Sequence, residues 1–401
     1  MKIKVYNSCV MLMALLALNS AGFAQDNATP EKPADKVDIN LDLKPLQLTL
    51  ANLGSDLKEL KANITANVEP AIHGLLNDVH VYVNNSISLN EENAAVSERT
   101  KNYTKTYSID GNDKIAIDNR YGKVVINTWN RNEVKVDVEI KSYADDDQTA
   151  QRMIDAITIS DSKDGNGVAF RTNFGRGDDK SIWDLFNMRN DHHKSEVNYM
   201  VYMPSGNPLD LRNRYGAVTL PSLSGKVSID NSYGSITAQK LTNPGNEFNF
   251  RYYEVDIDEL GGAAMNLSYG SLKLGTVGKL EANVRYAPID IGRLNSSGSF
   301  NIRYGGGIKI NGISKGLKNL DINSSYSSVN INLKGDEQFT FDVTIKNSSF
   351  KYDENKVTLT SKSPNNERGY HPTKNYKGYM GSSNANAQIS INSTYESVKF
   401  E

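Results

Sequence analysis

Cysteine, net charge and long hydrophobic runs are all nearly absent from this sequence of 401 residues. The single cysteine is Cys9, so a chain that loses its first residues has no thiol, which excludes disulfides, thiolate metal sites and cysteine nucleophiles. A formal net charge of −2 gives no overall basic field, and we therefore expect no nucleic-acid partner. No apolar stretch is long enough to cross a membrane, so we expect no transmembrane span.

Catalytic and metal-binding signatures are missing as well. The sequence has no HExxH, GxSxG, phosphate-loop or dinucleotide-binding pattern, so hydrolase and nucleotide functions lack their minimum parts. His192 and His193 are adjacent in a polar stretch, and the acidic runs at 145–147 and 178–179 lack the spacing of a calcium loop. We therefore expect no enzyme, no cofactor and no metal site.

The N-terminal segment predicts export. Lys2 and Lys4 precede an apolar run at 9–18, and Ala-Gly-Phe-Ala at 21–24 offers small residues for cleavage, so 1–24 is interpreted as a signal peptide. Residues 25–44 resemble a polar linker. A stripe of apolar residues at 46–68 with steps of three and four predicts an amphipathic helical segment over 45–100. It packs on the open end of the following domain, mediates self-association through a short coiled-coil seam, or contacts a membrane surface.

Residues 101–205 predict a β-rich part with one helix and one insertion. Period-two alternation at 107–143 is typical of strands, whereas the stretch at 145–157 opens with acids and spaces its apolar residues as a helix does. The Gly- and Asp-rich stretch at 165–194 is interpreted as a polar surface insertion before the next strand.

A tyrosine-centred repeat dominates the rest of the chain. Seven tyrosines between Tyr215 and Tyr326 are separated by 18, 19, 17, 17, 18 and 22 residues, and Tyr121 and Tyr395 have the same surroundings. The shared pattern is an apolar strand, Arg or Ser, Tyr-Gly, and a second apolar strand, as in NRYGAVTL and LSYGSLKL. A fixed period of this length predicts a single-stranded parallel β-solenoid with coils of about 18 residues over 206–345.

Alternation within a repeat predicts which side chains face the core. In FNFRYYEVDI, Phe248, Phe250 and Tyr252 share one parity, so we expect the tyrosines to stack inside the coil at about 4.8 Å. We expect the glycine after most of them to have a positive φ at the corner. Four residues past the tyrosine, Asp256, Lys273 and Asp290 predict neighbouring ion pairs on stacked strands.

Outward positions just before the tyrosine predict a polar strip. Arginine recurs at the residue preceding the tyrosine, and asparagine recurs two residues earlier. Guanidinium and amide groups bind the hydroxyls and carboxylates of glycans or acidic polymers, although such columns also satisfy one another in stacked coils. The candidate ligand strip consists of Arg251, Arg285, Arg303, Asn249, Asn283 and Asn301.

These parts, in this order, resemble a known family. IAIDNRYGKVVINTWNRNEVKVDVEI, the acid-headed helix, the strand VNYMVYMPSG and the repeats that follow are similar to the β-strand-repeat family of exported bacterial proteins classed as putative adhesins. The resemblance covers about 103–345. It implies a β-solenoid and an adhesin role, and it has no catalytic residues to carry over.

The sequence thus predicts an all-β protein exported to the periplasm or cell surface that acts as a non-enzymatic adhesin or envelope binding scaffold. Its partners would be a glycan or an envelope protein. The alternatives are a self-associating structural envelope protein and a polysaccharide-active β-helix enzyme. Residues 346–401 are interpreted as C-terminal strands that cap the last coil, with a mobile loop containing Tyr370, Tyr376 and Tyr379.

Overall fold

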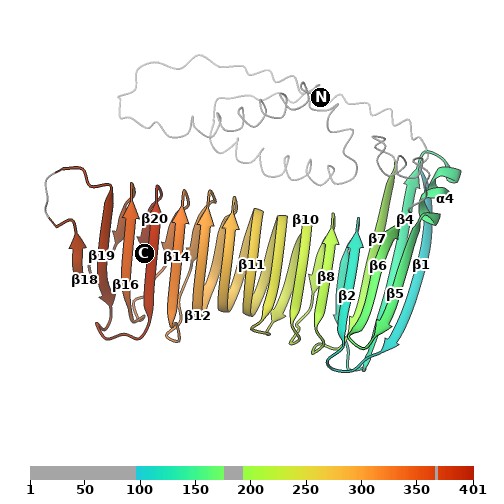
Figure 1. Cartoon of the computed structure of the whole chain (residues 1–401), viewed down its shortest axis with the longest axis horizontal. Coiled ribbons are helices and arrows are strands. Elements are labelled where there is room, and N and C mark those ends of the chain that lie inside the picture. The colour runs from blue at the N-terminus through green and yellow to red at the C-terminus, as the bar shows by residue number, and fades with distance from the viewer. Residues whose placement is uncertain (1–95, 176–192, 366–368) are drawn as a thin grey trace, which may run out of the picture. The chain divides into compact units, whose positions relative to one another are not determined.

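The computed structural model describes residues 96–175, 193–365 and 369–401, which form an all-β unit with one helix (Figure 1). The chain divides into two units, 1–91 and 92–401, and the described residues belong to the second. The predicted signal peptide, the linker and most of the helical segment lie outside the described residues. Residues 97–100, at the end of that predicted helical segment, are instead the first part of a strand.

The N-terminal part contains parallel and antiparallel strands. Its elements are β1 (Ser97–Ser108), β2 (Lys114–Arg120), β3 (Val124–Thr128), β4 (Glu133–Ala144), α4 (Asp147–Asp155), β5 (Ile157–Asp164), β6 (Gly167–Phe174) and β7 (Lys194–Met203). Strand β2 lies between β6 and the later strand β8 (Leu209–Arg214), and β3 lies between β7 and β9 (Val218–Leu220), all in parallel. Antiparallel β5, β4 and β1 complete this end.

Helix α4 confirms the helix expected at the acidic run. Asp146 is its N-cap, and the carboxylate accepts a hydrogen bond from the backbone N–H of Thr149 at 2.8 Å. Hydrogen bonding by the Thr149 side chain, and then by its backbone N–H, lowers the pKa of Asp146. Ala150, Met153 and Ile154 are buried, as their spacing predicted. The predicted insertion at 165–194 begins differently, because 167–174 form strand β6; residues 176–192 lie outside the described residues.

The repeats form a parallel ladder in register. Their strands are β8 (Leu209–Arg214), β9 (Val218–Leu220), β10 (Val227–Leu241), β11 (Asn246–Arg285), β12 (Ile289–Arg303), β13 (Ile308–Ile310), β14 (Asn319–Ser325) and β15 (Val329–Ile331). Each residue before a tyrosine pairs with its equivalent one repeat further on, for example Ser232 with Arg251 and Arg285 with Arg303. Of the predicted ion pairs in the outer column, that of Lys273 with Asp256 is confirmed, at 2.7 Å.

The C-terminal strands do not follow one another in chain order. They are β16 (Phe339–Lys346), β17 (Phe350–Tyr352), β18 (Val357–Ser363), β19 (Thr373–Met380), β20 (Gln388–Thr394) and β21 (Val398–Phe400). Strand β20 inserts between β14 and β16, and β21 inserts between β15 and β17 (Figure 1). The final strand covers the edge of β14, as expected, but it is not the outermost strand, because β16, β19 and β18 lie beyond it and β19 is antiparallel to both of its neighbours.

The whole sheet is mixed, because antiparallel pairs lie at both of its ends. This corrects the expectation of a wholly parallel sheet. A parallel stack ends in strands with unpaired backbone groups, and an adjacent antiparallel strand satisfies them through a short connection. The predicted loop with three tyrosines is also partly a strand. Tyr376 and Tyr379 belong to β19, and Tyr376 is buried, whereas Tyr370 is exposed.

The tyrosines face solvent, so the expectation that they point inward is wrong. All nine repeat tyrosines have a φ between 52° and 72°, in the left-handed region. A left-handed residue breaks the alternation of a strand, so two successive side chains, such as Arg251 and Tyr252, both point outward. The next residue returns to the core, where Tyr253, Ala287 and Ser327 are buried.

The glycine after the tyrosine serves close approach rather than a positive φ, which also corrects the prediction. Gly216 and Gly234 are absent from the positive-φ residues of the described chain. A Cβ at Gly216 would lie 1.9 Å from the carbonyl oxygen of Gly122, and one at Gly234 would lie 2.0 Å from that of Gly216. Glycine therefore lets the backbones of successive corners pack against one another.

Candidate functional site

Nine exposed tyrosines form a continuous stack of rings along one corner of the repeats, which we call the tyrosine ladder. Neighbouring ring centroids are 4.4 to 5.6 Å apart, and neighbouring planes differ by 5° to 16°. With strands about 4.8 Å apart, the ladder extends for roughly 40 Å. Its members are Tyr121, Tyr215, Tyr233, Tyr252, Tyr269, Tyr286, Tyr304, Tyr326 and Tyr395.

Backbone hydrogen bonds at the corner fix the rise from one ring to the next. The N–H of Tyr215 donates to the carbonyl oxygen of Ser232 at 3.0 Å, and that of Tyr286 donates to Arg303 at 3.1 Å. Buried polar side chains brace some of the corners from inside. The amide of Asn213, for example, donates to the carbonyl oxygen of Gly216 at 3.0 Å. The ladder is therefore imposed by the main chain and not by ring contacts alone.

Different side chains close the two ends of the ladder. At the N-terminal end the ring of Phe174 meets Tyr121 edge-on, with centroids 5.5 Å apart and planes at 86°. At the other end Asn347 occupies the tenth corner with a φ of 49° and accepts a hydrogen bond from the hydroxyl of Tyr370. Asparagine tolerates the left-handed region better than most residues, so this corner keeps its conformation without an aromatic ring.

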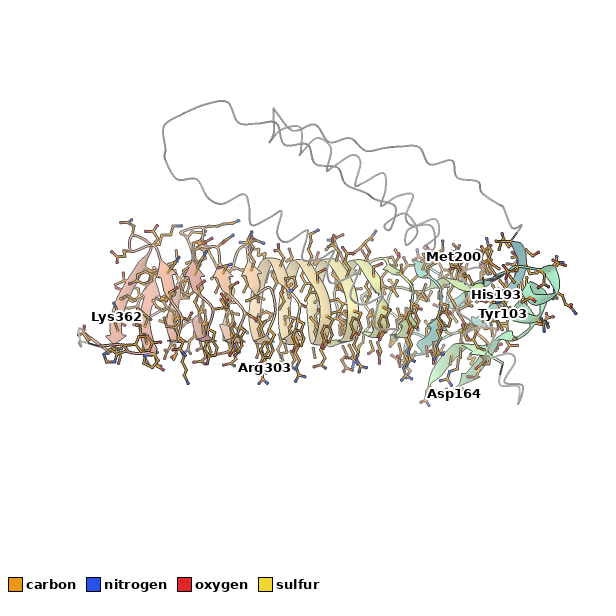
Figure 2. The ribbon with its side chains drawn as sticks, turned by 90° about the horizontal axis from the view of Figure 1, so that it is seen from above. Tyr103, Asp164, His193, Met200, Arg303 and Lys362 are labelled. Atoms are coloured by element: carbon orange, nitrogen blue, oxygen red, sulfur yellow. The ribbon has the colours of Figure 1, made fainter. Side chains whose placement is uncertain are left out.

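A row of cations lies directly beside the ladder, at the residue before each corner. We call it the cation column; its members are Arg120, Arg214, Arg251, Arg285, Arg303 and Lys346, with serine or threonine at the remaining corners. Within the described part of the chain, none of the six forms an ion pair within 4.0 Å. Arg303 projects outward from the middle of the row of strands (Figure 2).

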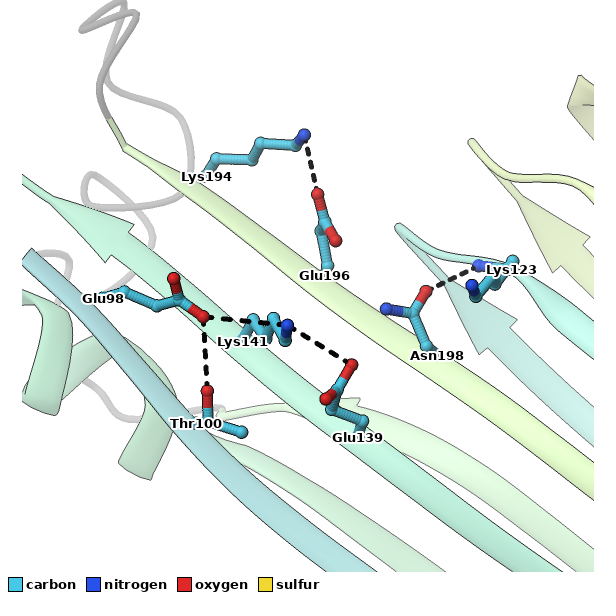
Figure 3. A network of polar contacts seen from close by, with 8 residues as sticks. All are labelled: Glu98, Thr100, Lys123, Glu139, Lys141, Lys194, Glu196 and Asn198. Atoms are coloured by element: carbon cyan, nitrogen blue, oxygen red, sulfur yellow. Dashed lines mark hydrogen bonds and ion pairs between the residues drawn. The ribbon is translucent and has the colours of Figure 1, made fainter. Parts of the chain in front are cut away.

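Some charges elsewhere on the surface are neutralised by neighbours, as in the network at the N-terminal end (Figure 3). Lys141 lies 3.7 Å from Glu98 and 3.6 Å from Glu139. Glu98 is on β1, and Glu139 and Lys141 are on β4. Lys194 lies 2.7 Å from Glu196 on β7 and is the first cause of the lowered pKa of that carboxyl. This network differs from the cation column, whose members have no ion pair in the described part of the chain.

The predicted strip is thus divided between two columns. Arg251, Arg285 and Arg303 lie next to the ladder, whereas Asn249, Asn283 and Asn301 lie one column further from it. Some asparagines satisfy one another: Asn283 donates to Asn266 at 3.2 Å, and Asn392 donates to Asn323 at 3.2 Å. Whether the six predicted residues bind a ligand stays a prediction.

Two shallow hollows lie at the N-terminal end of the same face. The larger has a volume of about 680 Å³ and is lined by Arg120, Arg171 and Phe174, and the smaller measures about 420 Å³ beside Asp161 and Arg212. Arg171 is 3.2 Å from Asp118 in the first hollow, so part of its charge is neutralised.

Polar side chains at this end have structural partners. The hydroxyls of Tyr103 and Tyr107 both donate to Asp161, which connects β1 to β5 and lowers the pKa of the Asp161 carboxyl. His193 lies 3.5 Å from Asp145. Among the described residues, no three His, Cys, Asp or Glu side chains are grouped as a metal site requires.

Sequence reasoning predicted the stacking of the tyrosines but not their outward position, although one signal pointed to it. Phe250 and Val255 both face the core yet are five positions apart, and an odd separation requires one break in the alternation. The break had to lie near Tyr252. The pattern alone did not say which residue takes the left-handed conformation, because glycine is the usual choice and it follows immediately.

Comparisons with known proteins give weak similarity only. No family model and no curated protein matches the chain. Three solved structures align with 75% of it: a putative cell adhesion protein from Clostridium sporogenes (9% identity, 99% of that chain, TM-score 0.19), a putative adhesin from Parabacteroides distasonis (11%, 97%, 0.29) and a putative adhesin from Bacteroides fragilis (11%, 97%, 0.30).

The names of these neighbours agree with the adhesin class that the sequence resembles. TM-scores of this size carry no argument about fold or function, so the surface must be interpreted from its own residues. No helix in the described segments has both the length and the apolar character needed to cross a membrane.

Proposed function

We propose that this protein is an exported, non-enzymatic binding scaffold of adhesin type. Its repeats at 206–345 would wind as a single-stranded parallel β-solenoid, a proposal that rests on the in-register pairing of successive repeats and the even spacing of the rings. The observation that carries the binding function is the exposed tyrosine ladder with unpaired cations beside it. A repeated surface of this kind suits an extended partner better than a small molecule, which needs a concave pocket.

Binding is tested with the full chain lacking only residues 1–24. The protein is labelled and applied to an array of glycans and to immobilised envelope fractions, with heat-unfolded protein as the control. We expect saturable retention of the folded protein on at least one component. If the folded and unfolded proteins are retained equally, or if nothing is retained, the scaffold function is wrong.

Export to the periplasm or the cell surface is a separate part of the proposal. It rests on the signal-peptide pattern of 1–24, which lies outside the described residues. Protease treatment of intact cells distinguishes the two locations, because a surface protein is digested whereas a periplasmic one is protected. Recovery of the protein only from the cytoplasm would contradict export.

A self-associating structural protein is the second candidate, and the edge strands argue against assembly through the ends. Lys101 and Lys105 are exposed on β1, and Lys362 is exposed on β18, at the opposite end of the row (Figure 2). Strand β18 also has a register shift between Leu359 and Ser361. Edge lysines and bulges oppose strand addition. Sedimentation equilibrium should give a monomer; concentration-dependent growth would favour the structural role.

A further inference from the structure

We propose that the tyrosine ladder and the cation column together bind a carboxylated polysaccharide whose chain lies along the stack of repeats. This inference rests on the proposed function and names the ligand class and the residues. It also changes the predicted strip: the tyrosines take part in it, and the arginines matter more than the asparagines, of which Asn283 already donates to Asn266.

The ladder presents ring edges and hydroxyls, since ring faces are covered by neighbouring rings. Tyr269, for example, is stacked on Tyr252 at 5.0 Å and on Tyr286 at 4.8 Å, yet it remains 45% exposed. Stacking of a nucleic-acid base or of a sugar face requires an open ring face. A row of phenolic hydroxyls instead offers one donor and acceptor per repeat, which suits a polymer rich in hydroxyl groups.

The cation column supplies positive charge along the same line. Arg285 and Arg303 are on adjacent strands, whereas Arg251 and Arg285 are separated by one serine corner, at Ser268. With about 4.8 Å between strands, the guanidinium groups repeat at one or two strand spacings. Arginine binds carboxylates through two parallel hydrogen bonds, so a chain with regularly spaced carboxylates can contact several of these groups at once.

The other side of the ladder leaves room for a chain. Two residues past the corner, most side chains are small: Ala217, Ser235, Ser271, Gly306 and Ser328. Glu254 is the acidic residue in this row among the described repeats. A polymer that lies against the ring edges is therefore attracted from one side and meets little steric hindrance on the other.

The experiment measures binding of polygalacturonate oligomers of increasing length to the full chain lacking residues 1–24. We expect affinity to rise with oligomer length and to fall with salt, because the contacts are ionic and exposed. Methyl-esterified oligomers, which keep the hydroxyls and lose the charge, should bind at least about tenfold more weakly. Ligand-induced change in tyrosine absorbance places the oligomer on the ladder.

The variant carrying Arg251→Ser, Arg285→Ser and Arg303→Ser tests the residues. Serine already occupies this position at Ser232, Ser268 and Ser325, so the corner should fold normally. We expect at least about a tenfold loss of affinity. The matched control, Lys309→Ser, Lys318→Ser and Lys334→Ser, removes the same charge from exposed positions outside the column and should retain wild-type affinity.

The outcomes separate this inference from the proposed function. Equal affinity of the arginine variant, equal binding of the esterified oligomers, or tighter binding of single-stranded DNA overturns the inference. If the array still retains the arginine variant on some other component, the scaffold function stands while the ligand class is wrong. If no array component and no oligomer is bound, the scaffold function itself fails.

Discussion

The ring of Tyr269 lies 4.8 Å from that of Tyr286 with only 5° between the planes, although both residues have left-handed backbones. A left-handed φ costs an L-residue about 1 kcal/mol or more. The repeats accept this cost at every corner. Because successive corners are in register, each strained tyrosine between the two ends of the ladder gains a stacked neighbour on each side, and the two effects can be separated by substitution.

Substituting Tyr269 should separate strain from stacking. Tyr269→Ala keeps the left-handed φ and loses both neighbours, so we expect it to lower the free energy of unfolding by about 1–3 kcal/mol. Tyr269→Gly loses the same contacts but relieves the strain, so it should be the more stable of the two by about 1 kcal/mol. Denaturant unfolding measures both. Wild-type stability in the alanine variant would mean that ring stacking contributes nothing.

Gly216 should not tolerate a side chain. A Cβ at this position would lie 1.9 Å from the carbonyl oxygen of Gly122. Because the clash is with backbone, it is relieved only if the two repeats move apart. We expect Gly216→Ala to cost about 2 kcal/mol or more. Gly111→Ala is the control, because nothing lies within 4 Å of the added atom, and it should change stability by less than about 0.5 kcal/mol. Similar melting temperatures for the two variants would contradict the close approach.

Asn231 should be replaceable by an apolar residue. Its side chain is fully buried, and neither amide atom has a hydrogen-bond partner in the described structure. The next residue in its column is Phe250. Removing an unsatisfied buried amide should raise the free energy of unfolding, so we expect Asn231→Leu to stabilise the protein by about 1–2 kcal/mol.

Asn119 provides the matched comparison for that substitution. It occupies the equivalent buried position, but it donates to the carbonyl oxygen of Val197 at 2.9 Å and accepts from the hydroxyl of Thr172 at 3.0 Å. Asn119→Leu leaves those groups without partners and should cost about 1–3 kcal/mol. Thermal unfolding of both variants checks the opposite signs. If both variants lost stability, the side chain of Asn231 would have a stabilising hydrogen-bond partner, and the prediction would be wrong.

Acid should weaken the contact between β1 and β5. The hydrogen bond from Tyr103, and then that from Tyr107, lowers the pKa of Asp161 in the folded state. A carboxyl with a lowered folded pKa stabilises the fold above its unfolded pKa and loses that contribution as the pH falls through the folded pKa. Stability should therefore decline as the pH drops below about 4.

The double variant Tyr103→Phe, Tyr107→Phe removes both donors and should show a smaller decline over the same pH range. Burial is the first cause that raises the pKa of Tyr103, followed by the hydrogen bond to Asp161, so the phenol stays protonated as a donor at neutral pH. Unfolding midpoints measured from neutral to acidic pH test the prediction. Parallel curves for the two proteins would assign the acid sensitivity to other groups.

Local pattern predicted much of the fold. The period of the repeats predicted the parallel register, the outward charges predicted the contact of Lys273 with Asp256, and acids before an apolar stripe predicted α4. Each of these three features depends on residues that are close along the chain or one repeat away, so the sequence contains the information needed to predict it.

The features that the sequence did not predict depend on backbone conformation and chain order. The outward position of Tyr252 follows from its φ of 52°, whereas the sequence favoured the glycine of the motif for that conformation. The insertion of β20 between β14 and β16 could not be predicted from the sequence either. All three strands have similar alternation, and any of them would fit any neighbour.

That insertion has a consequence for biogenesis. Residues 388–400 supply both strands of one internal repeat and bring Tyr395 to the ring of Tyr326, 4.4 Å away. Until this segment arrives, the strands ending at Ser325 and starting at Phe339 have no common partner. Both neighbours of β20 precede it in the chain, so this internal repeat is completed only after the strands on either side of it have been synthesised.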